Sequence, residues 1–173
     1  MKIKNRETIY DGFFKVEKVT AELNGHTLKR DLVTNKDAVA ALVYDTVKQE
    51  YLLIEQFRFP PQKVLIEIVA GLLDKPDEKP EAAIEREIAE EIGYETDKLE
   101  FIASFYSTPG SYSEKVTLYY AEVSRKTGQG GGVATEHEEI KTVAFSEEKL
   151  ISHPFEDAKT LLAAYWVKAG KPK

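Results

Sequence analysis

The sequence predicts an α+β protein in which a small N-terminal β hairpin precedes one larger domain. An Asn24-Gly25 pair, a strong signal for a two-residue turn, lies between two strand-like segments near the N-terminus. Short runs of β-branched and aromatic residues recur along the rest of the chain. Between them lies one helix with a clear apolar stripe, which ends at Gly93. We therefore expect residues 1–36 to form the hairpin domain and residues 37–173 the larger domain.

The composition argues against several classes of function. A formal net charge of −6 over 173 residues disfavours non-specific binding to nucleic acid or to anionic membranes. The absence of cysteine excludes disulfides and thiolate metal sites, and the three histidines lack the spacing of zinc ligands. No apolar run is long enough to span a membrane, and the N-terminus lacks the apolar region of a signal peptide. We expect a cytoplasmic protein with no nucleic-acid or membrane partner.

The predicted hairpin pairs Phe13–Leu23 with Thr27–Val33. Its aromatic residues Phe13 and Phe14 are open to two interpretations. They pack in a core or in a dimer interface, as aromatic side chains often do, or an exposed ring beside Arg30 stacks on a nucleobase. Both interpretations stay open at this point.

Six further segments have the composition of strands, and polar, glycine or proline turns separate them. They are Ala38–Tyr44, Glu50–Phe59, Val64–Ala70, Leu99–Tyr106, Lys115–Val123 and Ile140–Phe145. Ser146 is a good N-cap for a short helix that follows the last strand. A final helix within Phe155–Lys168 is predicted to pack against the sheet through large side chains at helical spacing. These are Leu161, Leu162, Tyr165 and Trp166.

The central helix combines an apolar stripe with a row of carboxylates. Ile84, Ile88 and Ile92 recur every four residues, which is the pattern of a core-facing stripe. Glu87 and Glu91 have the same spacing and border this stripe on one side. Such a helix is open to two interpretations. Its acidic face is solvated and balanced by lysines, as in most Glu-rich helices, or it holds a metal ion.

The metal interpretation rests on charge. With Glu90 one step further round the helix, three carboxylates repel one another at the edge of a buried face. A cation among them would remove this repulsion. Oxygen ligands suit Mg²⁺, with Mn²⁺ as the alternative ion. The carbonyl of Ala70, at the end of the preceding strand, can add a ligand.

A glycine-rich segment, Gly128–Gly132, is the second unusual stretch. Because glycine loses much conformational freedom on folding, consecutive glycines predict a mobile loop. Glu136, Glu138 and Glu139 follow this loop at once. A loop of this kind can bring a carboxylate to a metal site as gate and general base. The alternative is an acidic surface loop without function.

The order of residues around the helix resembles the signature of the Nudix hydrolases. The matching positions are Gly71, Glu78, Arg86, Glu87, Ile88, Glu90, Glu91, Gly93 and Tyr94. Six residues separate Gly71 from Glu78, one more than is usual in the family. This extra residue leaves open whether Asp77 or Glu78 fills the first acidic position.

The resemblance extends over most of the chain and implies a function. The Tyr10–Phe14, Ile54–Arg58 and Pro109–Glu114 segments and the glycine-rich loop look like the branch that acts on ADP-ribose and nucleoside diphosphate sugars. The GGGV stretch and the FEDAKTLLAAYWV segment are similar to the GDP-mannose hydrolases of that branch. The resemblance implies an α/β/α sandwich with a mixed sheet, and a homodimer that exchanges its N-terminal hairpin. It also implies Mg²⁺-dependent cleavage of the pyrophosphate bond.

Roles for individual residues follow from the resemblance alone. The implied metal ligands are Glu87, Glu91 and the carbonyl of Ala70, with Glu90 assisting. Arg86 would orient these carboxylates, in an ion pair with Glu78. The implied substrate contacts are Arg58, Gly110, Glu114, Phe13 and Arg30, the last two at the base. Glu136 aligns best with the glutamate that activates water, and Glu138 is next as base or extra ligand.

Two other functions are compatible with the same fold. One is a binding module that senses a nucleotide sugar without cutting it; the intact carboxylates favour the enzyme. The other is a house-cleaning hydrolase of nucleoside triphosphates, against which the N-terminal hairpin argues. The base, the sugar, the number of metal ions and the phosphorus attacked are not predicted by the sequence.

Overall fold

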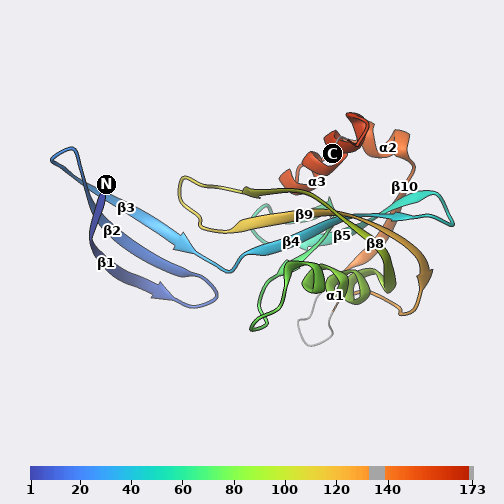
Figure 1. Ribbon diagram of the computed structural model, residues 1–173, viewed down its shortest axis with the longest axis horizontal. Coiled ribbons are helices and arrows are strands. Elements are labelled where there is room, and N and C mark those ends of the chain that lie inside the picture. Colours follow the sequence, from blue (N-terminus) through green and yellow to red (C-terminus); the bar gives the residue numbers. More distant parts are fainter. Residues whose placement is uncertain (133–138, 172–173) are drawn as a thin grey trace. The chain divides into compact units, whose positions relative to one another are not determined.

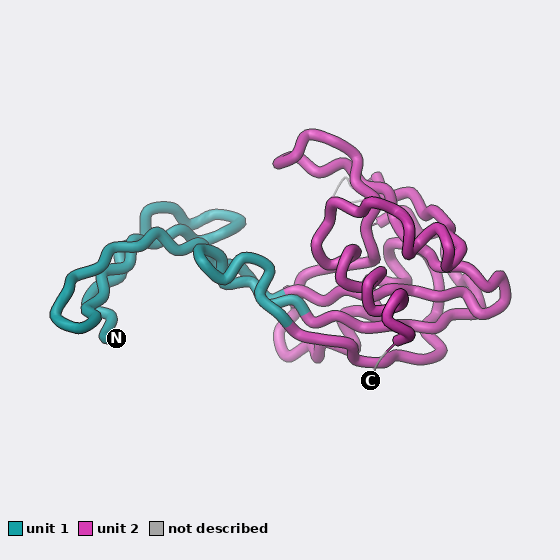
Figure 2. Tube along the Cα trace, turned by 90° about the horizontal axis from the view of Figure 1, so that it is seen from above, with its two compact units in different colours: residues 1–37, 105–116 teal, residues 38–104, 117–173 magenta. Residues whose placement is uncertain are grey.

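The computed structural model describes residues 1–132 and 139–171, which form two compact units (Figure 2). Unit 1 comprises Met1–Asp37 and Phe105–Val116. Unit 2 comprises Ala38–Ser104 and Thr117–Lys173. Two long strands contribute to both units, because their connecting turn belongs to unit 1.

Unit 1 is built on a three-stranded antiparallel sheet in the order β1-β2-β3. These strands span Lys2–Asp11, Lys15–Leu23 and His26–Thr34. Asn24 and Gly25 have φ values of 51° and 79°, as the predicted tight turn between β2 and β3 requires. β1 was not predicted. All its residues are exposed in the chain, so it lacks the alternation by which a half-buried strand is recognised.

The turn at Phe105–Val116 is bound to β3 rather than being an ordinary hairpin turn. The amide of Val33 donates to the carbonyl of Ser111 at 2.8 Å, and the amide of Ser113 donates to the carbonyl of Val33 at 3.0 Å. The Asn35 side chain donates to the hydroxyl of Tyr112 at 2.7 Å. Unit 1 is therefore assembled from two segments far apart in the sequence.

Unit 2 contains a sheet with the strand order β10-β5-β4-β9-β8, in which β6 also pairs with β5 and β7 with β4. The strands are β4 Ala38–Asp45, β5 Glu50–Arg58, β6 Lys63–Glu67, β7 Val69–Leu72, β8 Tyr94–Tyr106, β9 Lys115–Lys126 and β10 Lys141–Phe145. The predicted single strand Val64–Ala70 is divided at Ile68. Its first part pairs with β5 and its second with β4, both antiparallel.

The helices lie on both faces of this sheet (Figure 1). α1 (Pro80–Ile92) covers one face, and α2 (Glu147–Ser152) and α3 (Ala158–Lys168) cover the other. This arrangement is the α/β/α sandwich that the sequence predicted. Among residues 1–132 and 139–171, no helix is both long and apolar enough to cross a membrane.

The predicted stripe of α1 forms the centre of the core. Ile84, Ile88 and Ile92 are fully buried against apolar residues of the sheet. Gly93 ends the helix in the left-handed conformation with φ 76°, and its amide donates to the carbonyl of Ala89 at 3.1 Å. The predicted C-cap is thus confirmed, and so is Ser146 as the N-cap of α2.

The packing face predicted for α3 was wrong. Leu161, Leu162 and Tyr165 are exposed, and Trp166 is partly buried. The buried residues of α3 are Thr160, Ala163, Ala164 and Val167. These side chains are smaller than the four that were predicted to be buried, so apolar bulk did not identify the buried face.

A buried carboxylate holds the turn between β4 and β5. Asp45 is 1% exposed. Its Oδ1 accepts from the amides of Val47 and Lys48, both at 3.0 Å, and its Oδ2 accepts from the hydroxyl of Tyr94 at 3.0 Å. Burial alone would raise the pKa of Asp45, but these hydrogen bonds outweigh it and hold the pKa below its usual value.

Candidate functional site

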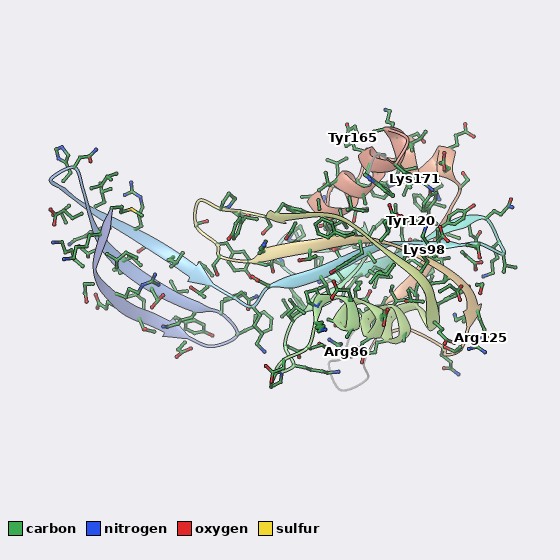
Figure 3. All side chains as sticks on the ribbon, in the orientation of Figure 1. Arg86, Lys98, Tyr120, Arg125, Tyr165 and Lys171 are labelled. Carbon is green, nitrogen blue, oxygen red and sulfur yellow. The ribbon has the colours of Figure 1, made fainter. Side chains whose placement is uncertain are left out.

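Arg86 of α1 (Figure 3) is the centre of a group of carboxylates from α1 and from the loop before it. Arg86 donates through Nε and Nη2 to the two oxygens of Glu78, at 3.1 and 3.2 Å. Its Nη1 donates to Glu87 Oε1 at 2.7 Å and to Glu90 Oε2 at 2.9 Å. Asp74 lies 3.7 Å from Nη2. We call these five side chains the Arg86 cluster: one positive charge faces four carboxylates.

The Arg86 cluster bears on which acid fills the first acidic position of the signature. Glu78 forms the two-pronged ion pair, and hydrogen bonding from Arg86 holds the pKa of Glu78 below its usual value. Asp77, in the same loop, adopts a left-handed conformation with φ 59°. The predicted pairing of Arg86 with Glu78 is therefore present, and it favours Glu78 over Asp77 for the first acidic position.

Gly71 allows Glu87 to lie over the end of β7. A methyl group at Gly71 would come within 2.1 Å of both Cδ and Oε1 of Glu87. Any side chain at this position would displace the carboxylate. Glu87 is thus packed against the backbone directly after Ala70, whose carbonyl is a predicted ligand. The motif therefore requires glycine at position 71 for a steric reason.

Glu91, one turn after Glu87, is a buried carboxylate that is 5% exposed. Burial of a charged group is costly unless other charges compensate. The charge of Glu91 contributes to raising the pKa of Arg58, after the larger effect of Glu67. Glu91 therefore lies within electrostatic range of the guanidinium that was predicted to contact substrate.

Arg58 belongs to a second ionic network, which we call the Glu67 network. Arg58 donates through Nε and Nη2 to the two oxygens of Glu67, at 2.7 and 3.0 Å. Lys159 of α3 also donates to Glu67, and to Asp157 at 2.9 Å. The buried Glu67 thus ties β5 to α3. This ion pair orients the guanidinium of Arg58. Its predicted contact with substrate stays a prediction.

The chemistry of the donors fits a hard divalent cation, although the ligands are not assembled into a ready-made centre. Within residues 1–132 and 139–171, no three acidic or histidine side chains are close enough to hold a metal ion. Glu87 and Glu90 both bind Nη1 of Arg86. The candidate ligands of α1 and the Ala70 carbonyl are all oxygens, which suits Mg²⁺ rather than a softer metal.

The glycine-rich segment differs from its prediction. Residues 127–132 are docked on the C-terminal end of α1 by backbone hydrogen bonds. The amide of Gly131 donates to the carbonyl of Glu91 at 2.8 Å, and that of Gly132 to the carbonyl of Glu90 at 3.1 Å. A mobile loop was expected from the ordering cost of glycine. Here the glycines are used for positive φ angles and close backbone approach.

The remaining predicted residues are placed as follows. Glu136 and Glu138 lie outside the described residues. Phe13 is 71% exposed and meets Phe14 edge to face at 5.2 Å. Arg30 is exposed and donates to the carbonyl of Lys29 at 2.8 Å. Exposed aromatic rings in unit 1 favour a binding role over a core role within one chain.

Gly110 and Glu114 belong to the turn of unit 1. Gly110 is exposed, with nothing within 4 Å of where a methyl group would stand. Glu114 accepts from the hydroxyl of Ser107 at 3.2 Å. Their predicted contact with substrate stays a prediction.

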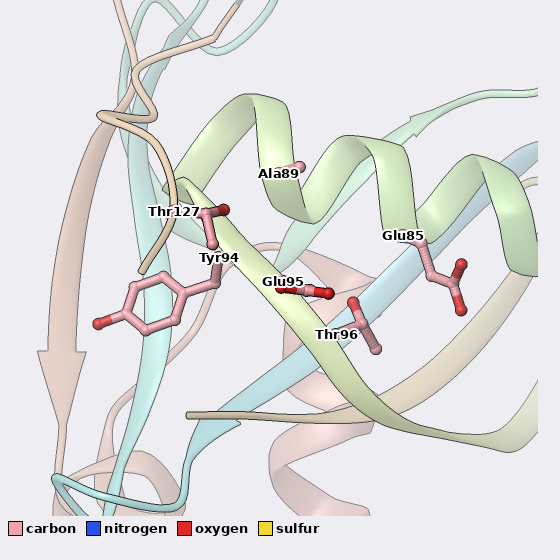
Figure 4. Close-up of a pocket in the computed structure, with 6 residues that line it drawn as sticks. All are labelled: Glu85, Ala89, Tyr94, Glu95, Thr96 and Thr127. Carbon is pink, nitrogen blue, oxygen red and sulfur yellow. The ribbon is translucent and has the colours of Figure 1, made fainter. Parts of the chain in front are cut away.

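A pocket of about 410 Å³ lies on the other flank of α1 (Figure 4). Its lining residues are Glu85, Ala89, Tyr94, Glu95, Thr96 and Thr127. By helical position, Glu85 and Ala89 lie on the opposite side of the apolar stripe from Glu87 and Glu91. The pocket thus contains none of the predicted site residues. Glu85, which carries the same charge on the opposite flank of the helix, is a matched control for substitutions in the Arg86 cluster.

Sequence reasoning missed Glu67 and Lys159. Their partners lie in other elements, and no local pattern marks the pair. The strand residue Glu67 was the one available signal, because a carboxylate in a buried strand needs a cation.

Comparisons with known proteins agree with this geometry. The NUDIX domain model matches residues 34–164. A GDP-mannose pyrophosphatase of Cronobacter sakazakii is 34% identical, over 88% of this chain and 86% of the relative. A methanol dehydrogenase activator of Bacillus methanolicus is 32% identical, over 94% and 89%. A crystal structure of an ADP compounds hydrolase has the same fold, with a TM-score of 0.78 and 24% identity over 99% of this chain and 98% of that one. The chain belongs to the Nudix hydrolase family, as its signature predicted.

Proposed function

We propose that the protein hydrolyses the pyrophosphate bond of a nucleoside diphosphate sugar, of the GDP-mannose or ADP-ribose type, in a reaction that depends on Mg²⁺. The observation that carries the proposal is the Arg86 cluster, in which four carboxylates surround one cation at the edge of a buried helix face. The names of a GDP-mannose pyrophosphatase and of an ADP compounds hydrolase among similar proteins support the substrate class. The products would be a nucleoside monophosphate and a sugar phosphate.

Glu87, Glu91 and the carbonyl of Ala70 would hold the metal, with Glu90 assisting. When bound, Mg²⁺ supplies positive charge that neutralises the diphosphate and acidifies the attacking water, with Mn²⁺ as an alternative ion. Arg86 fixes Glu87 and Glu90 from one side and is itself fixed by Glu78. A second role of Arg86 is to limit the repulsion among these carboxylates until the metal binds.

The substrate contacts implied by the resemblance stay proposals, one residue at a time. Arg58 would contact the diphosphate, since Glu67 holds its guanidinium in a fixed orientation. Phe13 and Arg30 would meet the base, and Gly110 and Glu114 would line the substrate. Replacement of Phe13 by alanine should raise KM with little change in kcat if stacking binds ground state and transition state equally. An unchanged KM would return Phe13 to a packing role.

Glu136 is proposed as the general base that takes the proton from the attacking water, with Glu138 second in line. Glu136→Gln should lower kcat by roughly two to four orders of magnitude. Glu138→Gln is the matched control, with the same loss of charge two residues away. A larger effect in Glu138→Gln would exchange the two roles.

We further propose that two copies form a homodimer that exchanges the N-terminal hairpin. Apolar side chains on β1 and the turn after it support this: Ile9, Tyr10 and Phe13 are 51%, 55% and 71% exposed in one chain. A partner subunit would cover part of this surface. Light scattering coupled to gel filtration should give twice the chain mass, and Ile9→Lys should shift the protein to monomer. A monomeric wild type would remove this part of the proposal.

A product screen tests the reaction directly. The protein is incubated with Mg²⁺ and GDP-mannose, ADP-ribose, GTP or dGTP, and the products are separated by ion exchange. Monophosphate release from a diphosphate sugar, lost in Glu91→Gln, is the expected result. Preference for a triphosphate would favour the house-cleaning function. Tight binding of a nucleotide sugar without turnover, with either Mg²⁺ or Mn²⁺, would make the protein a binding module.

A second candidate function is the activation of an alcohol dehydrogenase. It is favoured by one observation, the 32% identity with a methanol dehydrogenase activator over 94% of this chain. Addition of the protein to a methanol dehydrogenase assay, with and without Mg²⁺, tests it. If the dehydrogenase rate is unchanged and the product screen shows hydrolysis of a nucleotide sugar, the activator function is rejected and hydrolysis is retained.

A further inference from the structure

The last turn of α1 is electrostatically unfavourable by itself. A helix C-terminus carries partial negative charge on its unpaired carbonyl groups, which basic side chains usually balance. The last turn of α1 contains no basic residue and carries Glu90 and Glu91 instead. These are two of the carboxylates proposed to hold the metal. The Gly93 cap satisfies the carbonyl of Ala89, and the carbonyls of Glu90 and Glu91 need other donors.

Backbone amides of the glycine-rich segment occupy this position. Gly131 and Gly132 donate to the carbonyls of Glu91 and Glu90 at 2.8 and 3.1 Å. The amide of Gly128 donates to the carbonyl of Gly93 at 2.9 Å, so the contact continues past the helix end. Three glycines of one chain segment thus donate backbone hydrogen bonds to the helix end.

The approach is closest at Gly130, where only glycine fits. A methyl group there would lie 2.7 Å from the carbonyl oxygen of Glu91 and 2.8 Å from Cα of Ile92. Both contacts are to backbone, which cannot turn aside as a flexible side chain can. Among the residues that the structure describes, a methyl group at Gly131 would meet only the carbonyl of Ile140 at 3.9 Å, and one at Gly128 only Cα of Gly93 at 3.6 Å.

We propose that Gly130–Gly132 form a positioning clamp, which holds the last turn of α1 so that Glu91 keeps its metal-binding geometry. This inference rests on the proposed function, because it takes Glu87 and Glu91 as metal ligands. The clamp acts through the helix backbone and touches neither substrate nor metal. At an ordinary helix end, basic side chains balance the partial negative charge of the last carbonyl groups. Here the amides of Gly131 and Gly132 do so, and the carboxylate of Glu91 needs no basic side chain beside it in the last turn.

The clamp and the metal are coupled by linkage. If docking of Gly130–Gly132 favours metal binding, metal binding must favour docking by the same factor. The amides of Gly131 and Gly132 should therefore exchange with solvent more slowly when metal is bound. A purely structural cap would show no such dependence.

Three glycine substitutions separate the clamp from general backbone strain. Gly130 and Gly131 have φ values of 72° and 101°, and Gly128 does not have a positive φ. The φ of Gly131 lies further from the left-handed region that alanine tolerates, so strain alone predicts the larger effect at Gly131. The clamp predicts the reverse, because only a methyl group at Gly130 strikes the helix backbone.

The experiment measures Mn²⁺ affinity by electron paramagnetic resonance on folded protein without substrate. We expect Gly130→Ala to raise the Kd for Mn²⁺ at least about tenfold, in the range seen when the supports of metal ligands are removed. Gly131→Ala should have a smaller effect and Gly128→Ala the smallest, within about twofold. An effect of Gly131→Ala equal to or above that of Gly130→Ala would overturn the clamp.

Hydrogen exchange of the wild type keeps the test valid if Gly130→Ala does not fold. With Mg²⁺, exchange of the Gly131 and Gly132 amides should slow in the wild type and stay unchanged in Glu87→Gln. Equal exchange with and without Mg²⁺ in a wild type that binds Mn²⁺ would contradict the clamp but leave the proposed function intact. A wild type that binds no Mn²⁺ would instead contradict the metal site of the proposed function.

Discussion

The Arg86 cluster and the Glu67 network are two ionic groups in the same unit with opposite balances of charge. In the first, Arg86 faces four carboxylates within 4 Å. In the second, Glu67 is shared by Arg58 and Lys159, and Asp157 balances the second cation. The Glu67 network is neutral as a set. The Arg86 cluster has an excess of three negative charges.

This difference separates a structural network from a site. A buried carboxylate whose charge is fully matched needs no ligand, and its removal should damage the fold. A cluster that keeps surplus charge near a buried helix face is strained until a cation arrives, so its removal should damage binding and leave the fold intact. The predictions below test this contrast in order of expected size.

Glu67→Gln should cause the largest loss of stability. It leaves two cations, Arg58 and Lys159, with Asp157 as the one remaining carboxylate of the network, around a 2% exposed position, and breaking a buried pair costs about 3–5 kcal/mol. Urea unfolding measures the change. Glu156→Gln is the control, because the exposed pair of Glu156 with Lys63 should contribute about 0–1 kcal/mol. Equal losses in both variants would show that the Glu67 network is not structural.

Glu87→Gln should reduce kcat/KM at least about 100-fold, since a metal ligand contributes more than the groups that support it. Its folded stability without metal should be unchanged or slightly higher, because one repulsive charge is removed. Glu85→Gln removes the same charge from the opposite flank of α1. Comparable losses of activity in the two variants would indicate an effect of helix charge and not of metal ligation.

Acid should remove the stabilisation that comes from buried carboxylates whose pKa is lowered by folding. Burial opposes ionisation of Glu67, but the hydrogen bond from Arg58 and the charge of Lys159 outweigh it and hold the pKa below its usual value of 4.5. The pKa of Asp45 is likewise held below 3.8. Groups with lowered pKa stabilise the fold above their unfolded values, and this stability is lost as the pH falls through the folded values.

The free energy of unfolding should therefore fall from about pH 5 downward. The fall should be shallower in Glu67→Gln, which lacks one of the carboxylates whose pKa is lowered in the folded chain. Urea titrations at several pH values, at constant ionic strength, measure both slopes. Identical slopes would mean that Glu67 has the same pKa in the folded and unfolded chain.

The smallest change in stability is expected for a substitution in the loop that precedes α1. Asp77→Gly should raise the free energy of unfolding by less than about 1 kcal/mol, because glycine adopts a φ near 59° without strain. Activity should persist. Glu78→Gln should lower the activity, because Arg86 loses a charged partner on one side. The opposite ranking in steady-state assays would assign the first acidic position to Asp77.

The same contrast explains what the sequence could predict. The Arg86 cluster lies within one turn and one helix, so residue order predicted its ion pair and the Gly93 cap. The Glu67 network joins residues 92 positions apart, and no local pattern connects Glu67 with Lys159. The docking of Gly130–Gly132 on α1 was missed because glycine indicates both mobility and close packing. β1 was missed because its residues are all exposed.

The central claim is that the surplus charge of the Arg86 cluster is the place of the metal. It is tested most directly by urea unfolding of the wild type and of Glu87→Gln, each with and without saturating Mg²⁺. Ligands that bind only the folded state stabilise it. We predict that Mg²⁺ stabilises the wild type and has little effect on the variant, which without Mg²⁺ is at least as stable as the wild type. Equal stabilisation of both proteins by Mg²⁺ would contradict the claim.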